Sequence, residues 1–131
     1  MATTNREIET AFNATLNAAG LGYDIGWHGV KFDPPDNGVW LEPRHLPNSD
    51  TVAGYGLSVS VLKTGIYSIT VYGRSGSGLA DLHIAAEAVK NVFPRGLLLV
   101  GGVRVTRTYI GSADVYEDKV FQTVTVEYSG S

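Results

Sequence analysis

The glycine- and serine-rich segment Gly73–Gly78 is the part of the chain that most resembles a ligand-binding loop. It separates a strand-like segment from a helix-like one, where backbone amides bind phosphate in many proteins. A phosphate loop also needs a lysine followed by serine or threonine, whereas Leu79 and Ala80 follow here. A dinucleotide fingerprint would need a parallel sheet. The segment is therefore interpreted as a flexible connector, with an adventitious anion at the helix N-terminus as the alternative.

The histidines give no metal-binding or catalytic motif. His28, His45 and His83 fall on three separate predicted elements, without HxH or HExxH spacing. A zinc site would need three or four ligands converging from distant parts of the chain. Solvated or core-edge positions are therefore expected for all three histidines, and no metal is assigned.

Serine nucleophiles and paired carboxylates give no catalytic motif either. The chain has no G-x-S-x-G elbow. Asp33 with Asp36, or Glu117 with Asp118, could form the pair that a hydrolase needs, but both pairs lie in polar segments typical of solvated turns. We expect no catalytic residue, no cofactor and no enzymatic activity. A small ligand-binding domain or enzyme using Gly73–Gly78 is kept as an alternative, with Asp81 and His83 nearby.

Arginines and large aromatic residues are weaker signals. Arg104 and Arg107 lie close together on a predicted strand, and surface or intersubunit ion pairs explain them more simply than nucleic-acid binding. Trp27, Trp40 and Tyr55 lie near loop-rich segments. Exposed aromatics can mark interfaces, but core positions are the commoner outcome.

The composition bounds the class of protein. A chain of 131 residues with 44% hydrophobic content predicts one domain spanning residues 1–131. The absence of cysteine excludes disulfides and thiolate metal sites. The net charge of -3 contains no block of like charge that would wrap nucleic acid. No apolar run reaches the roughly 20 residues of a membrane span, and residues 1–7 lack the apolar region of a secretory signal.

Two helices are predicted. The first runs from Asn5 to Ala19, because Thr4-Asn5-Arg6-Glu7 matches a capping box and apolar residues follow at helical spacing. The second runs from Leu79 to Phe93, with Ser77 as N-cap and Pro94 as the stop. Its expected buried residues are Leu82, Ala85, Ala86, Val89, Val92 and Phe93.

Alternation of apolar and polar residues predicts the strands. An antiparallel hairpin is the clearest prediction, with strands Leu57–Val61 and Tyr67–Val71 joined by a loop at Lys63-Thr64-Gly65. Pro43 places the strand that contains it at an edge or a bulge. The other predicted strands are Tyr23–Trp27, Val39–Leu46, Leu97–Val100, Val103–Ile110 and Lys119–Tyr128. The fold class is therefore α+β, a mainly antiparallel or mixed sheet with two helices packed on one face.

The order of these elements and several short strings resemble one known family. After the first helix come Phe32-Asp33-Pro34-Pro35 and Val39-Trp40-Leu41. Gly65–Tyr72, Phe93-Pro94-Arg95-Gly96 and Gly101–Val105 follow in that order. This arrangement is similar to the lambda-like tail terminator proteins of phages with long, non-contractile tails, and the similarity covers almost the whole chain.

The resemblance implies a structural protein of the virion. Members form a hexameric ring on the head-proximal end of the tail tube, stop tube polymerisation and offer the surface that the head connector joins. The implied partners are other copies of the chain, the tail tube protein and the connector protein. No membrane is implied, and DNA only passes through the ring lumen. Assembly is implied in the cytoplasm of the bacterial host, with another head–tail joining or tail-tube component as the alternative.

The polar segments Pro47–Ala53 and Gly111–Asp118 are predicted to be exposed loops. Because such loops commonly carry binding residues, they are the best candidates for contact with tube or connector. The candidate interface residues are Asn48, Ser49, Asp50, Thr51, Ser112, Asp114, Glu117 and Asp118.

Overall fold

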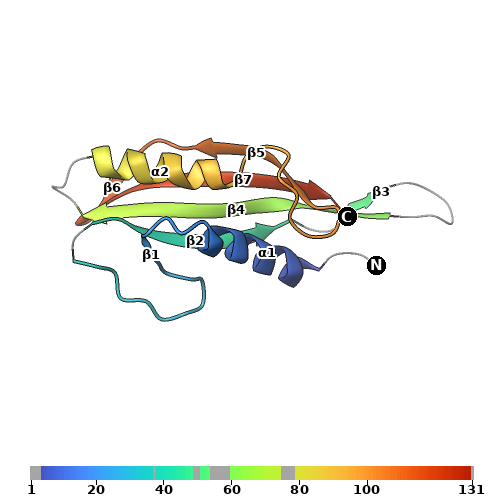
Figure 1. The fold of residues 1–131 in the computed structure, drawn as a ribbon, viewed down its shortest axis with the longest axis horizontal. Coiled ribbons are helices and arrows are strands. Elements are labelled where there is room, and N and C mark those ends of the chain that lie inside the picture. The colour runs from blue at the N-terminus through green and yellow to red at the C-terminus, as the bar shows by residue number, and fades with distance from the viewer. Residues whose placement is uncertain (1–3, 37, 49–50, 54–59, 75–78, 131) are drawn as a thin grey trace.

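The computed structural model describes residues 4–36, 38–48, 51–53, 60–74 and 79–130, with the backbone alone for 51–53 and 60–62. These residues form α1 (Asn5–Ala18), β1 (Asp24–Ile25), β2 (Trp40–Pro47), β3 (Thr51–Ala53), β4 (Ser60–Arg74), α2 (Ala80–Val92), β5 (Arg104–Ile110), β6 (Asp114–Tyr116) and β7 (Lys119–Gly130). Both helices pack on one face of the sheet, which confirms the predicted α+β class (Figure 1).

The sheet is built around its two longest strands. The order across it is β1-β2-β4-β7-β5, with β3 paired to β4 and β6 paired to β7. β1 and β2 pair in parallel, whereas the other described pairs are antiparallel. β4 and β7 pair from Lys63–Gly130 to Arg74–Lys119 without a shift in register. β4 therefore runs along the whole molecule and aligns the neighbouring elements.

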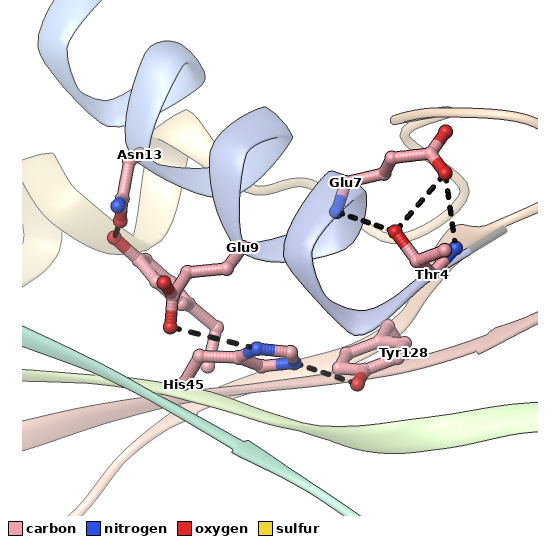
Figure 2. A network of polar contacts seen from close by, with 7 residues as sticks. Thr4, Glu7, Glu9, Asn13, His45 and Tyr128 are labelled. Carbon is pink, nitrogen blue, oxygen red and sulfur yellow. Dashed lines mark hydrogen bonds and ion pairs between the residues drawn. The ribbon is translucent and has the colours of Figure 1, made fainter. Parts of the chain in front are cut away.

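α1 begins where the sequence predicts. The hydroxyl of Thr4 accepts a hydrogen bond from the Glu7 amide at 3.1 Å, and a Glu7 carboxylate oxygen accepts one from the Thr4 amide at 3.3 Å (Figure 2). This capping box satisfies two amides that the helix itself leaves unpaired. Ile8, Phe12 and Leu16 then lie four residues apart on the buried face.

The N-cap of α2 differs from the predicted one. Its N-cap is Leu79, which makes no side-chain capping bond, while the predicted cap Ser77 lies outside the described residues. The expected apolar stripe is confirmed except at Val92, which is only half-buried. Because α2 packs on both β4 and β7, this stripe joins the two central strands to the helix layer.

The predicted hairpin is wrong, because β4 is one continuous strand across Lys63-Thr64-Gly65. Gly65 pairs with Pro47 on one side and with Tyr128 on the other, so it lies inside the sheet. A Cβ on Gly65 would lie 2.7 Å from the Tyr128 hydroxyl and 2.9 Å from the Leu46 carbonyl oxygen. The glycine therefore serves close approach within the sheet rather than a turn. Residues 57–59 of the predicted first strand lie outside the described residues.

Both predicted loops contain strand residues. Pro47 ends β2 and Thr51–Ala53 form β3, which pairs with residues 60–62 of β4. Asp114–Tyr116 form β6, which is joined to β7 by the two-residue turn Glu117-Asp118. Glu117 takes the positive φ of 56° that such tight turns require at one position. Three-residue strands are too short to show alternation, so only pairing with a longer strand reveals them.

Other strand predictions hold in part. The predicted strand Leu97–Val100 is reduced to a bridge between Leu98 and Arg104, and β1 is shorter than expected. The edge position of Pro43 is confirmed, because only Trp40 and Leu41 of β2 pair with β1. The Gly26 amide donates to the outward carbonyl of Leu41 at 2.7 Å. Pro43, two residues further, therefore directs its missing N–H away from the sheet.

An aromatic cluster lies between α1 and the sheet. Phe12 stacks on Tyr67 with ring centroids 4.5 Å apart, and its ring centroid is 5.6 Å from that of Phe93 and 5.5 Å from that of Tyr128. Phe12, Tyr67 and Phe93 are fully buried. Because large aromatic rings bury more area than other side chains, this cluster makes a large contribution to the attachment of both helices.

We predict that Gly65→Ala destabilises the fold by about 1–3 kcal/mol, the usual magnitude for overpacking a core site. The new methyl group would meet backbone atoms of β2 as well as the Tyr128 hydroxyl. Urea unfolding followed by circular dichroism would measure the loss. Gly111→Ala is the matched control, because its nearest neighbour would lie at 3.6 Å. A Gly65→Ala protein as stable as the control would contradict the continuous strand.

Candidate functional site

The sheet face opposite the helices is lined by small polar side chains. Ser68 and Thr70 of β4 and Thr123 and Thr125 of β7 alternate with the buried residues and are half-buried. The hydroxyls of Thr70 and Thr123 lie 3.5 Å apart. These side chains form a polar surface along the two central strands of the sheet. Thr70 pairs with Glu42 of β2 in the sheet, but within the described residues no hydrogen bond joins the Thr70 hydroxyl to that carboxylate.

One end of this polar face carries an aromatic stack. Trp40 is fully buried and stacks on Tyr72 with ring centroids 5.5 Å apart, and the centroid of Phe121 lies 6.0 Å from that of Tyr72. The guanidinium of Arg74 lies 5.0 Å from the Trp40 ring centroid. Burial, and secondarily Glu42, raises the pKa of the Tyr72 hydroxyl. Trp40 is therefore a core residue, as expected, although it lies on the face opposite the helices.

A groove of about 500 Å³ lies between the segment after β1 and this face. Its ionisable groups are His28 from the segment after β1, Glu42 and Arg44 from β2, and Tyr72 from β4. Gly26 is buried beneath Phe32, since a Cβ there would lie 2.7 Å from that ring. Among the described residues, no hydrogen bond or ion pair joins His28 to Glu42 or Arg44, so they form no catalytic dyad.

His45 lies in a polar network under α1 (Figure 2). Its Nε2 lies 2.7 Å from the Tyr128 hydroxyl, and its Nδ1 lies 3.8 Å from a Glu9 carboxylate oxygen. The Tyr67 hydroxyl donates to Asn13 next to it. Burial lowers the pKa of His45, and the nearby Glu9 opposes that change. Burial, with a smaller contribution from Glu9, raises the pKa of Tyr67. His45 is thus the core-edge histidine that the sequence predicts.

The other histidine and carboxylate candidates form no cluster with one another in the described residues. His83 Nδ1 lies 3.0 Å from Gln122 Oε1, and Gln122 Nε2 donates to the Gly111 carbonyl at 2.7 Å. Asp33 and Asp36 are both exposed, and Glu117 and Asp118 form the turn between β6 and β7. Within the described ranges, no three His, Asp or Glu side chains gather as metal ligands would. Of Gly73–Gly78, residues 75–78 lie outside these ranges.

Arg74 connects the segment between β1 and β2 to the β6–β7 turn. Its Nε and Nη2 donate to the Pro35 carbonyl oxygen at 3.2 and 3.1 Å. Its Nη1 lies 3.1 Å from Asp118 Oδ2. The Arg74 side chain is 25% exposed and that of Asp118 is 69% exposed, so solvent screens this ion pair. One arginine therefore fixes two segments far apart in sequence. Apart from a charged residue after a predicted strand, nothing in the sequence indicates this role.

The candidate interface residues fall at opposite ends of the molecule. Asn48 bonds Thr64 through its side chain at 3.2 Å, and Thr51 pairs with Leu62 near the start of β4. Ser49 and Asp50 lie outside the described residues. Figure 1 shows β3 and β6 near opposite ends of the long axis. The candidates Ser112, Asp114, Glu117 and Asp118 are exposed at the β6 end, and so are Val115 and Tyr116.

The comparisons with known proteins agree with this architecture. A solved protein structure aligns with a TM-score of 0.76 and 21% sequence identity, covering 99% of this chain and 97% of that one. This likeness concerns the fold. No curated protein sequence matches the chain. The family model described as phage tail terminator protein matches residues 7–128.

An α+β domain without a catalytic constellation in its described residues fits a structural class of protein. The chain belongs to the phage tail terminator family. It is therefore a structural component of a phage tail, and so of the virion. Neither described helix has the length and apolar character needed to cross a membrane.

We predict that Arg74→Ala frees the segment between β1 and β2, because it removes both bonds to Pro35. Limited proteolysis should cut residues 28–36 several-fold faster, with little change elsewhere. Arg74→Lys should not restore protection, since a lysine lacks the planar fork that lets arginine bond Pro35 and Asp118 together. Arg44→Ala is the control, because this exposed arginine of the same face has no described partner. Equal cleavage of all variants would refute the role of Arg74.

We predict that His45 makes stability fall at acidic pH. The pKa of His45 is lower in the folded protein than in the unfolded one. The unfolded chain therefore binds more protons as pH falls from about 6.5 towards the folded value. Urea unfolding between pH 7.5 and pH 5 should show a smaller decline for His45→Gln than for the wild type. An identical decline would show that burial of His45 has no such effect.

Proposed function

We propose that this protein forms a ring on the head-proximal end of the tail tube, stops tube polymerisation and offers the joining surface for the head connector. The family match over residues 7–128 is the observation that carries the proposal. The ring is proposed to contain six copies. The long sheet supports this function, because one rigid element reaches both ends of the molecule.

The dimensions suit a protein that joins two partners. The 15 residues of β4 extend over about 46 Å from the first to the last, at about 3.3 Å a residue. Polar candidate residues lie near each end of this strand. We propose that one end contacts the tube protein and the other the connector. Separate surfaces would let the ring block further tube subunits while the head is still absent.

We propose that residues 1–131 act as one domain without enzymatic activity or a resident cofactor. The described hydrogen bonds of His45 with Tyr128 and of His83 with Gln122 join one element to another, and this supports a structural role for both histidines. Assembly is proposed in the host cytoplasm, with DNA passing only through the ring lumen.

We predict that the purified protein limits the growth of tail tubes. Adding it to polymerising tube protein should give tubes of defined maximum length, capped at one end in electron micrographs. Asn48→Ala with Thr51→Lys, and Asp114→Lys with Glu117→Lys, should then give two different phenotypes. One pair should abolish capping, and the other should leave capped tails that fail to join heads.

Gly111→Ala serves as the control, because it alters neither end's charge nor its hydrogen bonds. Tubes that grow equally long with and without the wild-type protein would refute the proposed function. If instead the protein is incorporated along the whole tube, a tube component becomes the better description. If both variant pairs show the same phenotype, the assignment of separate ends to separate partners is wrong.

A further inference from the structure

The two lateral margins of the sheet carry opposite charge. Residues 88–113, which reach the β5 margin, contain four basic residues and no acidic one. Residues 22–38, at the β1–β2 margin, contain three carboxylates against one lysine. The strand order places these margins on opposite sides of the sheet, about four strand spacings or ~19 Å apart. Figure 1 shows β5 along one long side and the segment between β1 and β2 along the other.

A groove of about 580 Å³ marks the basic margin. Lys90 and Arg95 contribute to it from the end of α2, and Arg107 from β5. Arg107 is partly neutralised by Glu127 at 3.7 Å, and its guanidinium lies over Tyr109 at 4.4 Å. Lys90 lies in the last turn of α2, where a cation also complements the helix dipole. Among the described residues, no carboxylate pairs with Lys90, Arg95 or Arg104.

The strand beside this groove has an open edge. The Gly111 amide donates to the Thr123 carbonyl at 2.9 Å, so alternate residues of β5 direct their peptide groups towards β7. Thr108 and Ile110 therefore direct theirs outward, and no described group bonds them. An unpaired strand edge is a template on which another polypeptide chain can form backbone hydrogen bonds. This feature favours a protein partner over DNA at the groove.

The acidic margin offers a matching segment. Asp33 and Asp36 are exposed, while Pro34 and Pro35 between them are half-buried. Arg74 fixes this segment through the Pro35 carbonyl, so the two carboxylates are held outward from a positioned backbone. A pre-positioned segment loses less conformational entropy on binding than a free one.

We propose that the Asp33–Asp36 segment of one copy docks into the Lys90–Arg95–Arg107 groove of the next copy. This inference rests on the proposed ring and adds the surfaces that close it. Two different patches on opposite margins make a head-to-tail contact, and such contacts generate rings when the rotation closes. Ion pairs at the margin set the register, while the open edge of β5 supplies backbone groups to the neighbour.

Charge reversal of either margin tests the contact. Arg95→Glu with Arg104→Glu changes the formal charge of residues 88–113 from +4 to 0, and Glu127 beside Arg107 then makes this margin net acidic. Asp33→Lys with Asp36→Lys changes residues 22–38 from -2 to +2, so that both margins are basic. Each double variant should associate about tenfold more weakly or worse, because juxtaposed like charges are repelled. Light scattering coupled to size exclusion measures the assembly, and urea unfolding confirms that each variant remains folded.

Mixing the two double variants is the decisive measurement. Each basic margin would then meet an acidic one, so alternating rings should form from proteins that do not assemble separately. Lys31→Glu and Glu87→Lys are sign-matched controls, since the first makes the acidic margin more acidic and the second adds positive charge directly before the basic segment 88–113. Both controls should assemble at least as well as the wild type.

Three results would overturn this inference. The first is that the double variants assemble like the wild type. The second is that the mixture of the two double variants stays monomeric. The third is normal assembly of Arg95→Glu with Arg104→Glu together with lost binding of duplex DNA, which would assign the groove to DNA. In each case, tube capping by the wild type would leave the proposed function intact. A wild type that neither assembles nor caps tubes would refute the proposed function itself.

Discussion

The structure depends on one long strand that is paired on both sides. β4 shares its register with β2 along eight residues and with β7 along twelve. This double pairing makes the centre of the sheet rigid, because every peptide group there is held between two neighbours. The helices then cover one face, and the segment between β1 and β2 lies against the other. The close approach of β2, β4 and β7 at Gly65 shows how little space this arrangement leaves.

The polar groups in the core are organised to match this rigidity. His45 bonds Tyr128, and Tyr67 donates to Asn13, both beneath α1. Within the described residues, no buried side-chain nitrogen or oxygen lacks a partner. A satisfied polar network fixes the position of α1 over the sheet more specifically than apolar packing alone. In a protein that works as part of an assembly, such a core keeps the two ends of the molecule in a fixed position relative to each other.

Local signals in the sequence predicted the helices and the last strand, whereas contacts between distant residues determined the rest. The capping box of α1 and the alternation along β7 involve neighbouring residues only, so both could be identified. Lys63-Thr64-Gly65 has the composition of a turn, and only the Tyr128 hydroxyl and the Leu46 carbonyl explain its glycine. The role of Arg74 depends on Pro35 and Asp118, which lie 39 and 44 positions away. The candidate residues for contact with tube or connector depend further on the surfaces of those proteins, which this chain does not encode.

A bulge in β5 determines which side chains of this strand lie on each face of the sheet. The register shifts between Val105 and Arg107, so Thr106 is an extra residue with no opposite partner. The bulge takes Thr106 out of the alternation, so Val105 opposite Tyr128 lies on the buried face, Arg107 opposite Glu127 lies on the polar face, and Thr108 lies beneath α2. If Thr106 were instead paired in the ladder, every later residue would shift by one position and the guanidinium of Arg107 would turn towards the core. Loss of Thr106 itself would leave both faces unchanged, so relatives can gain or lose this one residue without altering the side chains that the margin presents.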